Sequence, residues 1–280
     1  MSKADQDLYL ATAYEQAELL TKRYSSSFSA AIGVLPSLQR NQIYAVYGFV
    51  RLADEIVDAG FAINPEKELN HLESELNKAI EVRYSSNLIL HAFQDTVHQV
   101  GIDRGHIDAF LRSMHMDHDL TVFTEDQYKE YIYGSAEVVG LMSLAIFCGG
   151  NAELIAQLVA PARALGSGFQ KVNFLRDVQA DSFGRGRMYF PGVAFDHFTD
   201  SDKLKIQQEI AAEFREAAKA IPALPHKAST AVQLALTYYE ALLREIQLVS
   251  AAELLTRRVR VADSKKAALA AKVLLQRALR

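Results

Sequence analysis

The chain has 280 residues, half of them hydrophobic and 23% charged, which is the balance of a globular protein with a sizeable core. Its net charge of −4 at pH 7 argues against a nucleic-acid partner, which would require a clustered excess of basic residues. Proline and glycine are scarce, helix-forming residues fill the long segments, and no linker or repeat divides the chain, so we expect a single all-α domain over residues 1–280.

Helical periodicity begins near Leu8 and continues, with breaks, to the end of the chain. The proline and polar residues at 36–40 are expected to separate a first segment from a helix that begins near Asn41 and ends at 59–60. The Asn-Pro pair at 64–65 is typical of a helix start and predicts a third helix there.

Further along the chain, glycines within 101–105 mark a boundary before another short helix. Residues 125–147 predict a long helix that is polar at its start and almost wholly apolar later, so it should be central. Pro161 is expected near the start of the next helix, which continues to Asp181.

Residues 182–187 are the clearest loop, and helical patterns resume from about 201, break at 222–225 and return as far as 246. The single cysteine, Cys148, lies in an apolar run and rules out a disulfide framework within the chain, which suits a reducing cytoplasm. The longest apolar stretch, 138–148, is too short to cross a bilayer. We therefore expect a cytoplasmic protein that is at most peripheral to a membrane.

A polar stripe follows one face of the second predicted helix. It consists of residues at i, i+4, i+7 and i+11: Tyr47, Arg51, Asp54 and Asp58. Their neighbours are mostly apolar, so the stripe lies on a helix otherwise suited to a core, and Glu55 adds a carboxylate beside it. Paired carboxylates on a largely buried helix are costly unless a cation lies between them.

The same pattern recurs 123 positions later. The residues at i, i+3, i+7 and i+11 are Gln170, Asn173, Asp177 and Asp181, and Arg176 stands beside them. Two such helices facing each other would place four aspartates around one cavity. Hard oxygen ligands suit Mg²⁺, which shares its coordination with water and substrate phosphates, and arginines add charge-assisted contacts to those phosphates.

Three other features have simpler interpretations. His115 and Asp119 have the spacing of metal ligands but lie at a predicted helix end, where polar residues are common. The serines at 25–27 suit a helix cap as well as a binding element. Five basic residues could form a solvated face, a patch for acidic lipids or a phosphate clamp: Arg257, Arg258, Arg260, Lys265 and Lys266.

At these positions the chain resembles the squalene/phytoene synthase family, the head-to-head prenyl diphosphate synthases. The resemblance extends from about residue 24 to 266 in matching order and spacing. The segments that carry it are 24–28, 47–58, 131–142, 170–181, 186–191 and 239–258. It implies an all-helical isoprenoid-synthase bundle with a deep central cavity. Glu55 stands where many members have aspartate, and Glu137 where glycine is common in plant-type members.

The resemblance also implies roles for individual residues. Mg²⁺ would be held by Asp54, Asp58, Asn173, Asp177 and Asp181. Diphosphate oxygens would be contacted by Arg51, Arg176 and Arg258, with Ser25, Ser27, Tyr47, Gln170 and Tyr239 nearby. The hydrocarbon channel would be lined by Phe28, Val139 and Leu141.

Within the family, the amino-acid sequences of the segments 131–142 and 169–177 most resemble those of bacterial phytoene synthases, which join two geranylgeranyl diphosphates without a reductant. Squalene or dehydrosqualene synthesis from two farnesyl diphosphates remains the alternative, with NADPH as an additional cofactor only for squalene. Two further hypotheses are a cyclising terpene synthase and a non-catalytic assembly factor, although the latter would be expected to lose some of the four aspartates.

Overall fold

The structure is a computed structural model of residues 1–280, of which it describes 2–58, 60, 62–181, 187–193 and 198–278. The predicted all-α fold is confirmed: among the described residues the one β-type pairing is an isolated bridge between Val122 and Met188. The helices are α1 (Lys3–Tyr24), α2 (Ser26–Ile32), α3 (Ser37–Asp58), α4 (Pro65–Val82), α5 (Leu88–Val100), α6 (Arg104–Asp119), α7 (Glu125–Ile132), η1 (Tyr133–Glu137), α8 (Val138–Phe147), α9 (Ala152–Gln179), α10 (Asp200–Ala220), η4 (Ile221–Ala223), α11 (His226–Gln247), α12 (Ala251–Leu254) and α13 (Asp263–Ala278).

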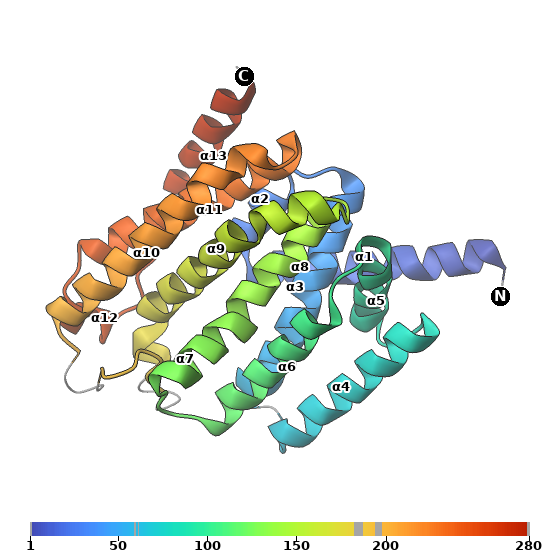
Figure 1. Ribbon diagram of the computed structural model, residues 1–280, viewed down its shortest axis with the longest axis horizontal. Helices are drawn as coiled ribbons and strands as arrows, with labels where there is room; N and C mark the ends of the chain where they lie inside the picture. The colour runs from blue at the N-terminus through green and yellow to red at the C-terminus, as the bar shows by residue number, and fades with distance from the viewer. Residues whose placement is uncertain (1, 59, 61, 182–186, 194–197, 279–280) are drawn as a thin grey trace.

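The longest helix, α9, lies in the middle of the bundle, with α8 on one side and α10 on the other (Figure 1). Helix α3 packs against α1, α5 and α8, and α11 packs against α9, α2 and α13. The two chain ends reach out of the bundle in different directions, at the start of α1 and the end of α13 (Figure 1). No helix in the described part of the chain combines the length and the hydropathy needed to cross a membrane.

Two predicted helix starts are wrong. Residues 37–40 do not precede a helix that begins near Asn41; they form the first turn of α3, because the Pro36 carbonyl accepts from the Arg40 amide at 2.8 Å. Pro161 lies well inside α9, which begins nine residues earlier where the Asn151 side chain caps the Leu154 amide. The predicted loop at 182–187 lies, apart from Arg187, outside the described residues.

The long helix predicted over 125–147 is present but interrupted by a π-helical turn, η1. This turn lies backbone to backbone against its neighbours at two glycines. A methyl group on Gly134 would meet the Ala109 carbonyl oxygen at 2.4 Å, and one on Gly166 would meet the Ala136 carbonyl oxygen at 2.6 Å. Glycine at these positions therefore allows α6, η1 and α9 to approach closely, which fixes the wall of the cavity described below.

The apolar core has two main parts. One is built from α3, α5, α6 and α8, and the other from α9, α10, α11 and the aromatic residues near 189–190. Phe28, Phe147 and Leu224 pack against both parts. Since these three side chains also line the central cavity, the cavity lies where the two parts of the core meet.

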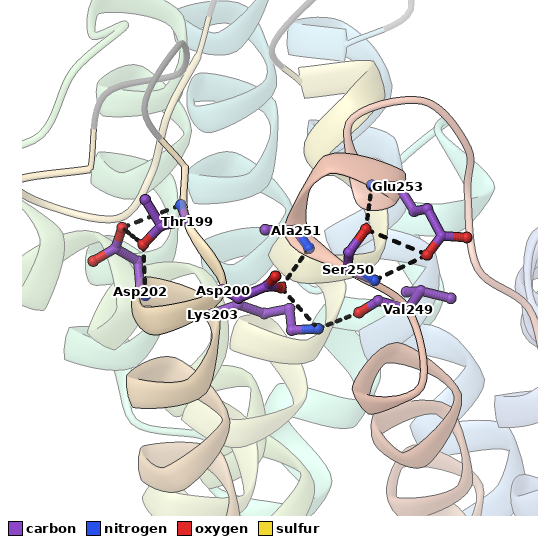
Figure 2. A network of polar contacts seen from close by, with 8 residues as sticks. All are labelled: Thr199, Asp200, Asp202, Lys203, Val249, Ser250, Ala251 and Glu253. Carbon is purple, nitrogen blue, oxygen red and sulfur yellow. Dashed lines mark hydrogen bonds and ion pairs between the residues drawn. The ribbon is translucent and has the colours of Figure 1, made fainter.

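A polar network joins the start of α10 to the start of α12 (Figure 2). Thr199 and Ser250 each form a capping box, with Asp202 and Glu253 respectively. The buried Lys203 ammonium donates to the Val249 carbonyl and lies 3.6 Å from Asp200, whose carboxylate accepts from the Ala251 amide at 2.7 Å. These contacts fix the segment that leads, a few residues later, to Arg258.

Candidate active site

A central cavity of about 500 Å³ is lined by residues from α2, α3, α8, α9 and α11. On three of these helices, the side chains that line the cavity are apolar near the N-terminal end and polar towards the C-terminal end. The change runs from Ile43 to Asp54 on α3, from Leu158 to Arg176 on α9 and from Ala231 to Tyr239 on α11. The wall contributed by α9 is about 27 Å long at the rise of an α-helix. The cavity is therefore a long apolar chamber with one polar end.

The polar end is formed by helix C-termini, where the backbone dipoles leave partial negative charge. Asp54 and Asp58 lie in the last turns of α3, and Asp177 lies in the last turn of α9. Each carboxylate there costs about 0.3–1 kcal/mol of electrostatic free energy unless cations compensate. The arrangement thus favours cations, and the first of these are arginine side chains of the protein.

Asp177 is held by two arginines. The Arg176 guanidinium donates to both of its carboxylate oxygens, with Nε at 3.0 and 3.1 Å, and Arg258 Nε lies 2.6 Å from Oδ1. Burial lowers the pKa of Arg176, but its hydrogen bond to Asp177 and the charge of that carboxylate raise it more, so the net shift is upward. Both arginines also line the cavity, where they can reach an anion.

On the facing helix, Asp54 lines the polar end of the cavity. Arg51 forms an i,i+4 ion pair with Glu55, and its guanidinium stacks over the Tyr24 ring at 4.2 Å from the centroid. Glu55, to which the sequence assigned no role, therefore holds an arginine of the cavity in place.

Aromatic side chains surround the boundary between the polar end and the apolar chamber. Tyr239 stacks on Phe169 with centroids 3.8 Å apart, and Phe28 contacts Tyr239 at 5.7 Å and Tyr47 at 6.2 Å. Burial raises the pKa of Tyr47 to about 12, so its hydroxyl stays protonated at neutral pH. Tyr239 also donates to Asn173, whose amide donates in turn to Gln170 at 3.5 Å.

Sequence reasoning missed an ion pair beside Asp58. Arg187 Nη1 lies 3.3 Å from Asp58 Oδ1 and 2.9 Å from Asp117 Oδ2. Asp117 lies between His115 and Asp119, the pair with metal-ligand spacing, yet Asp117 is the buried member of that run and Asp119 is exposed. Nothing in the sequence signalled this burial, because His115, His118 and Asp119 around Asp117 are polar, as is common at a helix end.

Most predicted site residues lie together around the cavity. Those that line it are Ser25, Phe28, Tyr47, Arg51, Asp54, Val139, Gln170, Asn173, Arg176, Tyr239 and Arg258. Four predicted residues are not among those that line the cavity. Asp58 lies one turn from Asp54, Asp177 is bonded to Arg176 and Arg258, Asp181 lies just beyond the end of α9, and Ser27 lies next to the lining segment.

Leu141 was expected to line the hydrocarbon channel, but it is not among the residues that line the cavity. It is buried against Leu144, Cys148 and Leu158, because successive helical residues are rotated by about 100° and Leu141 points away from the side shared by Val139 and Ser143. Gly140, Ser143 and Leu144 line the cavity in its place.

The structure places the serine run at 25–27 and the basic cluster near the C-terminus differently. Ser25 is a helix cap, accepting from the Phe28 amide at 3.2 Å, and it also lines the cavity. In the basic cluster, Arg258 alone reaches the cavity, whereas Arg257 pairs with Glu253, Lys265 with Glu245, and Lys266 with Asp263.

The donors at the polar end fit Mg²⁺ by their chemistry, since carboxylate and amide oxygens from two helices converge there. Within the described residues no group of three or more His, Cys, Asp or Glu side chains forms a ready-made cage for an ion. Mg²⁺ does not require such a cage, because it commonly binds one or two carboxylates together with substrate phosphates and water.

The chain matches the family model described as squalene/phytoene synthase over residues 21–265. It is 27% identical over 202 residues to a 4,4'-diapophytoene synthase of Staphylococcus haemolyticus, covering 70% of this chain and 68% of that protein. It is 30% identical over 204 residues to a phytoene synthase of Arthrospira platensis, covering 68% and 65%. The crystal structure of a dehydrosqualene synthase in complex with a ligand superposes with a TM-score of 0.82 at 23% identity, covering 97% of this chain and 98% of that one.

Proposed function

Because the chain belongs to the squalene/phytoene synthase family of prenyl-transferring enzymes, we propose that it joins two geranylgeranyl diphosphates head to head to give phytoene, with Mg²⁺ as cofactor. The observation that supports this most is the combination of one polar end, with arginines and aspartates from two helices, and a long apolar chamber. A prenyl diphosphate has the same division into a charged head and a hydrocarbon tail.

The arginines of this chain would bind the diphosphates. Arg51, Arg176 and Arg258 line the polar end on three different segments, so they can surround diphosphate oxygens and stabilise the negative charge that develops as the group leaves. Arg176 and Arg258 already share Asp177, which orients both guanidinium groups in advance of binding. This preorganisation lowers the reorganisation needed when charge develops.

Mg²⁺ would be held by Asp54, Asp58, Asp177 and Asp181 with help from Asn173, and when bound it supplies positive charge to the departing diphosphate oxygens. The carboxylates would give up part of their contact with arginine as the metal and substrate bind. Tyr239 and Gln170 hold the Asn173 amide between them, which fixes the orientation of its carbonyl oxygen.

The apolar chamber would receive the hydrocarbon tails and keep water from carbocations formed after diphosphate loss. In the proposed reaction, one diphosphate leaves as a carbon–carbon bond forms between the two chains, and loss of a proton closes the ring of a cyclopropylcarbinyl diphosphate. This intermediate loses the second diphosphate, rearranges and gives up a second proton to form phytoene. The π faces of Phe28, Phe169 and Tyr239 lie at the boundary where positive charge would develop, and aromatic faces attract cations.

The preference for a C20 substrate rests on the width of the chamber and on the phytoene synthase relative. Small side chains occupy the apolar wall on α10 and α11: Ala217, Ala220, Ala231 and Ala235. They leave room beyond the aromatic boundary for a long tail. The diapophytoene synthase relative favours a second candidate, the corresponding condensation of two farnesyl diphosphates.

The test is to incubate the purified protein and Mg²⁺ with geranylgeranyl diphosphate or farnesyl diphosphate, each with and without NADPH, and to identify the hydrocarbon. Phytoene formed without NADPH is the expected product. A C30 product would transfer the proposal to farnesyl diphosphate, and NADPH dependence would indicate squalene. Conversion of a single diphosphate to a cyclic product, or no binding of Mg²⁺ and diphosphate together, would contradict the proposed reaction.

A further inference from the structure

Asp117 on α6 is a buried carboxylate outside the two predicted aspartate pairs. It is 5% exposed and accepts hydrogen bonds from three side chains. The Tyr189 and Tyr131 hydroxyls donate to Oδ1 at 2.7 and 3.1 Å, while Arg187 donates to Oδ2. Burial raises the pKa of both tyrosines well above its usual value, so both hydroxyls remain protonated donors.

A buried carboxylate with three hydrogen-bond donors requires a physical explanation. A buried carboxylate costs several kcal/mol of free energy unless it is paired and hydrogen-bonded, and an apolar residue in its place would commonly be as stable. Tyr131, which lines the cavity, and Tyr189 also stack on one another and on Phe174. The network therefore links α6, α7 and the segment after α9.

Arg187 connects this network to the site. Its Nη1 contacts both Asp117 and Asp58, and the shorter of the two contacts is the one to Asp117. Asp117 thus anchors the guanidinium, whose charge is shared, among the described residues, between these two carboxylates. A carboxylate offers about four lone-pair positions, so Asp58 can be oriented through Oδ1 and still bind a cation.

We propose that Asp117 and Arg187 are positioning residues: Asp117 holds the Arg187 guanidinium, and Arg187 orients the Asp58 carboxylate for metal-dependent binding of the diphosphate. This inference rests on the proposed function, since it takes Asp58 to be a ligand of Mg²⁺. Neither positioning residue lines the cavity, and both act through Asp58.

Because Asp117 and Asp58 share the charge of Arg187, the effect of a substitution on the Mg²⁺ requirement can be predicted. Without the charge of Asp117, the ion pair of Arg187 with Asp58 would strengthen, and Arg187 would compete with Mg²⁺ for that carboxylate. Loss of such an outer partner weakens metal binding or activity by about 10- to 100-fold in metal sites. Removing the guanidinium as well should relieve the competition, so the double substitution should require less Mg²⁺ than the single one.

The experiment compares Asp117→Asn with Asp119→Asn, the same chemical change at an exposed residue two positions along the run. The thermal midpoint is followed as each protein is titrated with Mg²⁺ in the presence of inorganic pyrophosphate. The rate of product formation is followed in a separate Mg²⁺ titration with the prenyl diphosphate substrate. We expect half-saturation for Asp117→Asn to rise about tenfold in both measurements. Asp119→Asn should match the wild type, and Asp117→Asn/Arg187→Gln should lie between Asp117→Asn and the wild type.

A purely structural role would give a lower thermal midpoint for Asp117→Asn with unchanged Mg²⁺ half-saturation, and that result would overturn the inference. Should Asp117→Asn fail to fold, Arg187→Lys provides the test, because it keeps the charge but loses the Nη1 atom that contacts both carboxylates. An unchanged Mg²⁺ requirement in folded Arg187→Lys would also overturn the inference. A wild type that responds to neither Mg²⁺ with pyrophosphate nor prenyl diphosphates would instead refute the proposed function.

Discussion

Tyr239 on α11 donates a hydrogen bond to Asn173 on α9, with 3.3 Å between its hydroxyl oxygen and Asn173 Oδ1. This contact ties together two of the helices whose polar halves form the end of the cavity. It also joins the aromatic boundary of the chamber to the residues proposed to bind Mg²⁺.

Tyr239→Phe should lower turnover about fivefold, because one hydrogen bond contributes on the order of 1 kcal/mol and Asn173 would lose an orienting donor. The stacking on Phe169 would remain, so the thermal midpoint should change little. Steady-state kinetics and thermal unfolding provide the measurement. Tyr238→Phe is the control, since Tyr238 packs with Leu234 and Val273 away from the cavity; equal effects of both changes would argue against a role for the Tyr239 hydroxyl.

Asp54→Asn should reduce turnover about 100-fold or more while leaving the helical fold intact, because it removes a charge aimed at the polar end of the cavity and not a packed group. Asp177→Asn should behave similarly and also release Arg176 and Arg258 from their shared partner. Product formation measures the first effect and circular dichroism the second. Asp7→Asn, at an exposed position on α1, is the control, and wild-type turnover in Asp54→Asn would refute the metal assignment.

Ala231→Phe should shorten the apolar chamber and favour farnesyl over geranylgeranyl diphosphate. Ala231 lies two helical turns before Tyr239, about 12 Å from the polar end along α11. Overpacking should cost roughly 1–3 kcal/mol of stability, so the ratio of kcat/KM values for the two substrates is the appropriate measurement. An unchanged ratio in a folded variant would show that the tails do not reach this part of the wall.

Gly166→Ala should destabilise the protein by roughly 1–3 kcal/mol, because its methyl group would collide with the Ala136 backbone and not with a flexible side chain. At about 2 °C per kcal/mol for a chain of this size, the thermal midpoint should fall by several degrees. Gly33→Ala is the control, since the nearest atom to a methyl group there is 3.4 Å away. A midpoint for Gly166→Ala as high as that of the control would contradict the close approach of η1 and α9.

Lys203→Met should destabilise the segment that presents Arg258, because it leaves the Val249 carbonyl without its donor (Figure 2). A buried acceptor without a partner costs about 1–3 kcal/mol. We expect a lower thermal midpoint together with a raised KM for the diphosphate substrate. Lys205→Met, which alters an exposed lysine on the same helix, should change neither quantity; a lower midpoint with unchanged KM would separate the network from Arg258.

The helical fold was predictable because the spacing of apolar residues is a local property, and the aspartate pairs were predictable for the same reason. Asp54 and Asp58 are four residues apart on α3, so the helical repeat places them on one face, whereas Asp181 lies two residues beyond the end of α9. Helix boundaries at prolines were less predictable. Pro36 caps a helix and Pro161 lies inside one, and the choice depends on packing that the local sequence does not contain.

The rest of the site depended on contacts between residues far apart in the chain. Arg258 meets Asp177 across 81 positions, and Arg187 meets Asp58 across 129 and Asp117 across 70. The rotation of α8 decided that Val139 and not Leu141 lines the cavity. The sequence by itself determined which helices form and which carboxylates share a face, because those follow from the helical repeat. Only the tertiary structure decided which arginine neutralises which carboxylate, because ion pairing depends on distances that packing of the helices creates.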